Sequence, residues 1–135
     1  MLSSITRREI FNSAHRLHLP ELSEEENFEV FGKCSYPNYH GHNYEVHVTI
    51  IGEIDSRTGF VYDIAKLKQI MKDEIIEPYD HRNLNLDTDD FKTLIPTVEN
   101  ITKTVYDKIR ARIEPNYTVK VKIYETIRNY SEYPC

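Results

Sequence analysis

Three histidines of this chain have the types and spacing of a metal site. His40 and His42 are separated by one glycine, and residues two apart in an extended backbone point to the same side. Gly41 lets the backbone bend or lets a ligand approach closely. His15, at the end of an earlier predicted strand, provides a third imidazole. Three imidazoles without a fourth protein ligand are typical of an open, catalytic zinc site, and imidazole also suits copper, iron and nickel.

Cys34 lies six residues before His40, so we expect its loop to bring the thiol near the metal. A thiolate there could be a fourth metal ligand, a nucleophile or a general base. The alternative is a small apolar residue without a chemical role, which is the usual state of a single cysteine. The spacing alone leaves these alternatives open.

Several acidic residues are also candidates for chemistry. Asp80 precedes His81 in a polar segment, where a carboxylate either orients the imidazole or, with it, caps a loop. Glu125 continues the apolar face of a predicted strand. A carboxylate there must be paired, must bind a ligand or must reach water at the strand end, and it can accept two neighbouring N–H donors of a planar ligand. Thr97 and Glu99 open a predicted helix, where they are interpreted first as a cap and a dipole-compensating acid.

The elements that must position these residues follow from hydrophobic periodicity. Alternation with period two predicts strands, and apolar residues three and four apart predict helices. Residues 21–29, with five glutamates, and residues 79–96 are interpreted as loops. The predicted elements are strands over 5–14 and 43–51, a helix capped by Asp63 and ended by Pro78, a helix capped by Thr97 and ended by Pro115, and strands over 117–126 and 130–133.

The order β-β-α-α-β-β predicts one α+β domain over residues 1–135, with an antiparallel four-stranded sheet and both helices on one face. If the first two strands pair in antiparallel fashion, His15 at the end of one lies beside His40 and His42 at the start of the other. A four-stranded sheet has free edges that invite pairing with other subunits, so we expect an oligomer.

Composition excludes several classes of protein. The chain has 135 residues and a formal net charge of −5, which argues against a nucleic-acid partner. No apolar run approaches the length of a membrane span. Two cysteines, Cys34 and Cys135, cannot make a disulfide framework, which favours a reducing, cytoplasmic location. His18 and His47 are interpreted as exposed or cross-strand polar residues.

Taken together, these motifs resemble the 6-pyruvoyl-tetrahydropterin synthase family, which also contains 6-carboxy-tetrahydropterin synthase. Each motif is weak alone, but their joint order and spacing are specific. The resemblance runs over nearly the whole chain and rests on Phe11-Asn-Ser-Ala-His15-Arg-Leu, Gly32-Lys-Cys34, Pro37-Asn38, His40-Gly-His42-Asn-Tyr44, Gly59-Phe-Val-Tyr-Asp63, Asp80-His81-Arg-Asn-Leu84-Asn85, Pro96-Thr97-Val98-Glu99-Asn100 and Tyr124-Glu125-Thr126.

The resemblance implies a tunnelling fold (T-fold), in which trimers close their sheets into a barrel and two trimers stack into a homo-hexamer with active sites between subunits. It implies the conversion of 7,8-dihydroneopterin triphosphate, a small pterin substrate, to 6-pyruvoyl-tetrahydropterin and triphosphate without a redox cofactor. The roles implied are zinc ligation by His15, His40 and His42, general-base catalysis by Cys34, proton return by Asp80 and His81 of a neighbouring subunit, and pterin binding by Glu125, Thr97 and Glu99. Lys33 and Arg16 are candidates for the triphosphate.

Other reactions and roles stay open within this resemblance. A 6-carboxy-tetrahydropterin synthase of queuosine biosynthesis releases acetaldehyde from the same substrate, and such enzymes often have a shorter gap between the cysteine and His-Gly-His. Here five residues, 35–39, fill that gap, which favours pyruvoyl formation, and they contain no acid, which argues against a branch directed toward folate. Tyr39 and the Ile127-Arg128 pair depart from the family pattern, which puts side-chain specificity in question. The last alternative is a non-catalytic scaffold that binds zinc and pterin.

Overall fold

Two long antiparallel strands form the centre of the sheet. The computed structural model describes residues 1–135, and in it β1 (Leu2–His15) pairs with β2 (His40–Glu53) along their whole length. β4 (Thr118–Tyr124) pairs antiparallel with β2, and β5 (Tyr130–Tyr133) pairs antiparallel with β4. Both central strands are longer than the sequence predicts, so His15, His40 and His42 lie within strands.

The prediction of a four-stranded, purely antiparallel sheet is wrong. A fifth strand, β3 (Arg82–Asn83), pairs parallel with β1 and gives the order β3-β1-β2-β4-β5. The Ser13 hydroxyl donates to the Tyr79 carbonyl, and the His81 N–H donates to the Asn12 carbonyl, so the segment after Tyr79 is fastened to the β1 edge. These contacts join residues far apart in the chain and leave no periodic signal.

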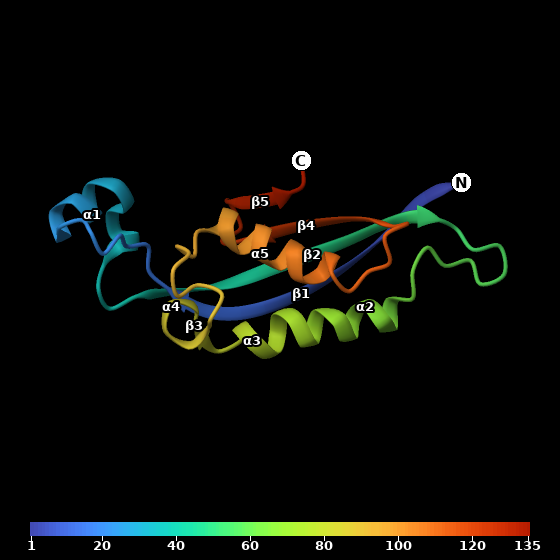
Figure 1. The fold of residues 1–135 in the computed structure, drawn as a ribbon, viewed down its shortest axis with the longest axis horizontal. Coiled ribbons are helices and arrows are strands. Elements are labelled where there is room, and N and C mark those ends of the chain that lie inside the picture. The colour runs from blue at the N-terminus through green and yellow to red at the C-terminus, as the bar shows by residue number, and fades with distance from the viewer.

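Both long helices lie on one face of the sheet, as predicted (Figure 1). The first begins at α2 (Ile64–Met71), widens into a π-helical turn (Lys72–Ile76) and ends with α3 (Glu77–Tyr79). The second is α5 (Val98–Arg110). Both contribute to a single buried cluster that also contains the apolar face of β2 and β4. None of the helices has the length and apolar composition needed to cross a membrane.

The π-helical turn has a local cause at Pro78, which lies inside the last helical turn instead of ending the helix before it. Proline has no N–H, so the carbonyl of Glu74 loses its usual helical donor. The Glu77 N–H donates to the Lys72 carbonyl, five residues back, and the Lys108 ammonium lies 3.3 Å from the Glu74 carbonyl. The freed carbonyl is therefore satisfied by a side chain of α5.

The glutamate-rich segment interpreted as a loop forms a helix, α1 (Glu24–Phe31), which projects from one end of the sheet (Figure 1). Ser23 and Glu26 form a complete capping box, in which each side chain bonds the other residue's backbone N–H. The buried Asn27 amide accepts from the Leu19 N–H and donates to the Leu19 carbonyl. A helical turn over residues 32–35 then leads toward β2, and a one-turn helix, α4 (Leu84–Asp87), follows β3.

A partly buried polar triad links α5 to the segment before it. The Tyr79 hydroxyl donates to Asp90 at 2.7 Å, and the Lys108 ammonium donates to the same carboxylate oxygen at 2.9 Å. Burial raises the pKa of the Asp90 carboxyl, but the bonds from Lys108 and Tyr79 outweigh it and hold the pKa below its ordinary value. The triad thus contributes stability only while Asp90 is ionised.

Asp90→Asn is expected to destabilise the protein by about 1 kcal/mol at pH 7, the scale of one net hydrogen bond, because the partly exposed carboxylate is screened by solvent. Because the pKa of Asp90 is lower in the folded chain, this contribution is complete above the ordinary carboxyl pKa and is lost as the pH falls through the folded value. Urea unfolding of both proteins at pH 7 and pH 3 should show the gap closing. Asp89→Asn, at an exposed neighbouring carboxylate, is the control and should change little at either pH. An Asp90→Asn gap that stays constant with pH would contradict the assignment.

Candidate active site

The ends of β1 and β2 bring three imidazoles together. His15 lies directly opposite His40 in the antiparallel register, as the predicted pairing requires. His42 follows two residues later on the same side of β2, and one ligand atom from each ring lies within 4.8 Å of the others. The three rings are mutually edge-on, with centroids 4.6 to 5.1 Å apart. Such a cluster has the ligand type and the spacing to hold one metal ion.

The hydrogen bonding of these rings leaves nitrogen lone pairs that could bind a metal. His15 is 1% exposed, and its Nδ1 lies 2.8 Å from the Pro96 carbonyl, which can only accept; Nδ1 therefore carries the proton and Nε2 keeps its lone pair. The Nε2 atoms of His40 and His42 are buried and have no hydrogen-bond partner. A buried polar atom without a hydrogen-bond partner lowers the stability of the fold, so a ligand bound to these nitrogens would stabilise it.

Burial also keeps the cluster uncharged. It lowers the pKa of His15 to about 4, against an opposing effect of the Pro96 carbonyl and with smaller contributions from the other two imidazoles. Burial is likewise the main cause of the lowered pKa values of His40 and His42. All three rings are therefore neutral near pH 7, which is the form that binds metal.

Tyr44 lies on the same side of β2, and no role at the site was predicted for it from the sequence. Its hydroxyl lies 3.2 Å from Nδ1 and 3.3 Å from Nε2 of His15. Burial raises the pKa of Tyr44, so the phenol stays protonated. The signal was available, because the period-two series of His40 and His42 continues to Tyr44.

Glu125 and the start of α5 border the histidine cluster. A Glu125 carboxylate oxygen lies 3.7 Å from His15 Nε2, and the side chain is 19% exposed. Burial raises the pKa of Glu125, the charge of His40 lowers it, and the charge of Glu99 raises it further. Thr97 caps α5 by accepting from the Asn100 N–H, and Glu99 lies exposed in the first turn. Glu125 is thus a largely shielded carboxylate that still opens to solvent.

Cys34 is affected by the charge of Glu125. Its thiol is half-buried, and burial raises its pKa, with a further increase from the Glu125 charge. The charges of Glu125 and Cys34 also raise the pKa of Tyr44, whose hydroxyl lies beside His15, but Cys34 is not one of the residues whose ligand atoms form the histidine cluster. Without a cation nearby, Cys34 is therefore a thiol at neutral pH.

Asp80 and His81 are brought together, and neither is a member of the histidine cluster. Their side chains lie 2.9 Å apart, and Asp80 also accepts from the Asn12 N–H at 2.8 Å. The bond from Asn12 is the main cause of the lowered pKa of Asp80. His81 has a positive φ of 60° and an 82% exposed side chain, and both residues lie along the β1 edge opposite β2. The pair faces outward, where another molecule can approach it.

Comparison with known proteins agrees with this arrangement. The family model described as 6-pyruvoyl tetrahydropterin synthase matches residues 4–134. The chain is 44% identical over 131 residues to the 6-pyruvoyl tetrahydrobiopterin synthase of Pongo abelii, covering 97% of this chain and 90% of the relative. It is 33% identical to the 6-carboxy-5,6,7,8-tetrahydropterin synthase of Bacillus subtilis, covering 78% of this chain and 73% of the relative.

The likeness extends to solved structures. The 6-pyruvoyl tetrahydropterin synthase of Caenorhabditis elegans superposes with a TM-score of 0.93 and 42% identity, and the match covers 98% of this chain and 95% of that one. A match of this extent includes the strand ends that carry the three histidines, the loop of Cys34 and the first turn of α5. The chain belongs to the 6-pyruvoyl tetrahydropterin synthase family.

Proposed function

We propose that this protein converts 7,8-dihydroneopterin triphosphate to 6-pyruvoyl-tetrahydropterin and triphosphate, with zinc held by His15, His40 and His42. The observation that carries the proposal is the cluster of three neutral imidazoles, two of them with unpartnered buried nitrogens, in a chain 44% identical to a 6-pyruvoyl tetrahydrobiopterin synthase. When bound, zinc supplies positive charge that polarises substrate oxygens, acidifies the neighbouring C–H bonds and favours a thiolate nearby.

The proton transfers are assigned to residues of the chain. Cys34, as thiolate, removes a proton bound to carbon. His81, oriented by Asp80, returns protons during the rearrangement. Reducing equivalents stay within the substrate, so no redox cofactor is required. Oxidation of one side-chain hydroxyl carbon is matched by reduction of the ring, and conversion of the other to a carbonyl is matched by reduction of the terminal carbon to a methyl group as triphosphate is lost. Triphosphate then leaves by elimination.

The position of Asp80 and His81 supports an active site shared between subunits. Their side chains face outward along the β1 edge, and these side chains bond only with each other and with the Asn12 N–H. If a second copy of the chain approached this edge, Asp80 and His81 of the first copy could lie beside the histidine cluster of the second. We infer a homo-hexamer made of two trimers, in which each site uses Cys34 of one subunit and His81 of the next. A cytoplasmic location accords with the two free cysteines.

Glu125 is assigned to pterin binding, supported by Thr97 and Glu99 at the start of α5. The pterin ring presents two neighbouring N–H donors, and a carboxylate can accept both. Glu125→Gln is expected to weaken binding of unsubstituted pterin about 10- to 100-fold, because an amide offers one acceptor and one donor in place of two acceptors. Titration by pterin fluorescence measures the change.

Glu132→Gln provides the matched control for that titration. Glu132 lies on β5, is half-exposed and pairs only with Lys122, so its replacement should leave pterin binding unchanged. Equal affinities of the Glu125→Gln variant and the unmodified protein would contradict the assignment of Glu125.

The product decides between pyruvoyl formation and the second candidate function, which the Bacillus subtilis relative favours. Zinc-loaded protein is incubated with 7,8-dihydroneopterin triphosphate, and the products are identified by mass spectrometry. We expect 6-pyruvoyl-tetrahydropterin together with triphosphate, since five residues separate Cys34 from His40. A 6-carboxy product with acetaldehyde would assign the protein to queuosine biosynthesis instead. Binding of zinc and pterin without any product would leave the non-catalytic scaffold.

A further inference from the structure

The two residues that follow His15 hold the loop that carries Cys34. The Arg16 guanidinium donates from Nε and Nη2 to the Ser35 carbonyl, at 3.0 and 2.7 Å. The Leu17 N–H donates to the Cys34 carbonyl at 2.9 Å. Two consecutive carbonyls of the Cys34 segment are therefore attached to the end of β1, directly beside a residue of the histidine cluster.

Arg16 is itself fixed from the other side. Its N–H donates to the Asn85 side-chain carbonyl at 2.9 Å, and the Asn85 amide donates back to the Arg16 carbonyl at 3.0 Å. Asn85 lies in α4, just after β3, and its own N–H is held by Asn83. The backbone of Arg16 is therefore fixed by Asn85, and its side chain restrains the position of Ser35.

The hydrogen bonds of the Arg16 guanidinium are those with the Ser35 carbonyl. Its side chain is only 15% exposed, and the single carboxylate near it, Glu24, lies 4.0 Å away with a 74% exposed side chain. The hydrogen bonds of the guanidinium thus go to a backbone carbonyl within the chain. A contact of Arg16 with the triphosphate stays a prediction.

We propose that Arg16 is a positioning residue for Cys34. The inference rests on the proposed role of Cys34 as the general base. The segment 32–35 is one short helical turn without a side-chain cap at its start, so it has little stability of its own. Without the Arg16 side chain, the bond from the Leu17 N–H would be the one left of the two attachments described above. A displacement of about 1 Å in a catalytic group is enough to cost about 100-fold in rate.

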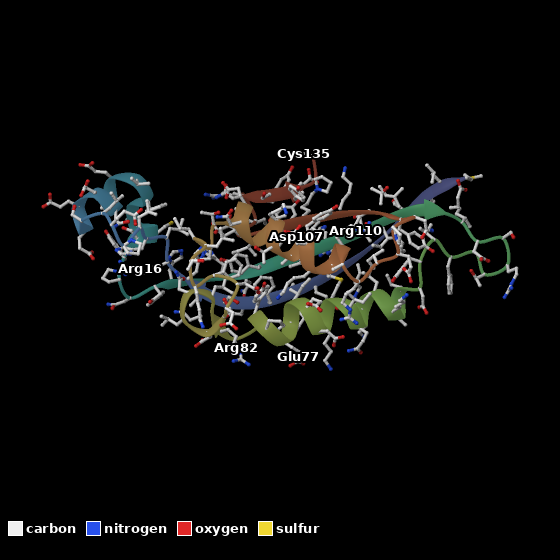
Figure 2. All side chains as sticks on the ribbon, viewed as in Figure 1. Arg16, Glu77, Arg82, Asp107, Arg110 and Cys135 are labelled. Carbon is white, nitrogen blue, oxygen red and sulfur yellow. The ribbon has the colours of Figure 1, made fainter.

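Arg16→Ala in the zinc-loaded protein tests the proposal through the thiol, independently of turnover. The rate of Cys34 alkylation by iodoacetamide, followed by mass spectrometry, should rise about tenfold as the loop opens locally. Cys135 is an exposed thiol beyond β5, far from Arg16, and serves as an internal standard whose rate should not change (Figure 2). Arg57→Ala, at an exposed turn, is the matched control and should leave both rates unchanged.

Kinetics separate positioning from substrate contact. With Arg16→Ala, kcat should fall about 100-fold while KM stays within about threefold. Arg16→Lys keeps a donor to Ser35 but not the two-pronged contact, so it should recover part of kcat and show an intermediate alkylation rate. It also keeps the test available if the alanine variant does not fold.

An unchanged Cys34 alkylation rate in both Arg16 variants would overturn the proposal, whatever their activity. A large rise in KM with unchanged kcat and unchanged alkylation would make Arg16 a substrate contact instead. If the unmodified protein showed no turnover, the proposed function would fail, while the alkylation rates would still measure the attachment of the loop.

Discussion

Cys34→Ala is expected to lower kcat by about 10²- to 10⁴-fold, the contribution of a positioned general base. The variant should keep its zinc and its affinity for pterin, because neither assigned site uses the thiol. Steady-state kinetics, metal analysis and pterin titration on the same preparation measure all three quantities. This combination separates an enzyme from a scaffold, which would lose nothing when Cys34 is removed.

Two companion variants sharpen this result. Cys135→Ala removes the only other thiol, which is exposed at the chain end, and should retain full activity. Mixing Cys34→Ala subunits with His81→Ala subunits, after dissociation and reassembly, should restore part of the activity, because some shared sites then contain an intact cysteine and an intact histidine. Full activity in Cys34→Ala alone would remove the cysteine from the mechanism, and no recovery in the mixture would argue against sites shared in this way.

The central part of the fold could be predicted because it obeys simple periodicities. Alternation along 43–51 and 117–126 identified the inner strands, and the apolar stripes after Asp63 and Thr97 identified the two helices that cover them. The antiparallel pairing of the first two strands then placed His15 opposite His40. Metal ligands carried by regular strands are within reach of such reasoning, because register converts sequence spacing into distance.

The parts that were not predicted depend on contacts between distant residues or on a signal that composition obscured. Strand β3 exists because Ser13 and Asn12 bind the segment around Tyr79 and His81. The attachment of the Cys34 loop to Arg16 is of the same kind. Helix α1 was recognisable from the Ser23–Glu26 capping box, but its glutamates were interpreted as a solvated loop.

The electrostatics of the site explain why its candidates depend on one another. Burial is the main cause that keeps the imidazoles of His15, His40 and His42 neutral and that raises the pKa of both Cys34 and Glu125. A divalent cation would reverse the last two effects, since it is the largest charge such a site can contain. Removing the metal should therefore impair more than substrate oxygen binding, because it also removes the charge that favours the Cys34 thiolate.

His42→Ala is expected to weaken zinc binding about 10²- to 10³-fold and to abolish turnover. Protein zinc sites bind with about 10–16 kcal/mol over four ligands, so one imidazole accounts for about 3 kcal/mol. Metal analysis after dialysis against a weak chelator measures the loss. The thermal unfolding midpoint provides a second measure, because bound zinc stabilises the folded state by mass action and the variant should need about 10²- to 10³-fold more zinc for the same rise.

His47→Ala is the control for that experiment. His47 lies on the same strand as His42, but it pairs with Glu45 and is not a member of the histidine cluster. Its replacement should leave the zinc content, the zinc-dependent rise in the unfolding midpoint and turnover unchanged. Full zinc retention by His42→Ala would contradict the proposed ligand set. The unpartnered nitrogens of His40 and His42 beside His15 would then not be explained by zinc binding. Loss of zinc from His42→Ala but not from His47→Ala would locate the metal at the paired ends of β1 and β2. It would then also be the charge that favours the Cys34 thiolate.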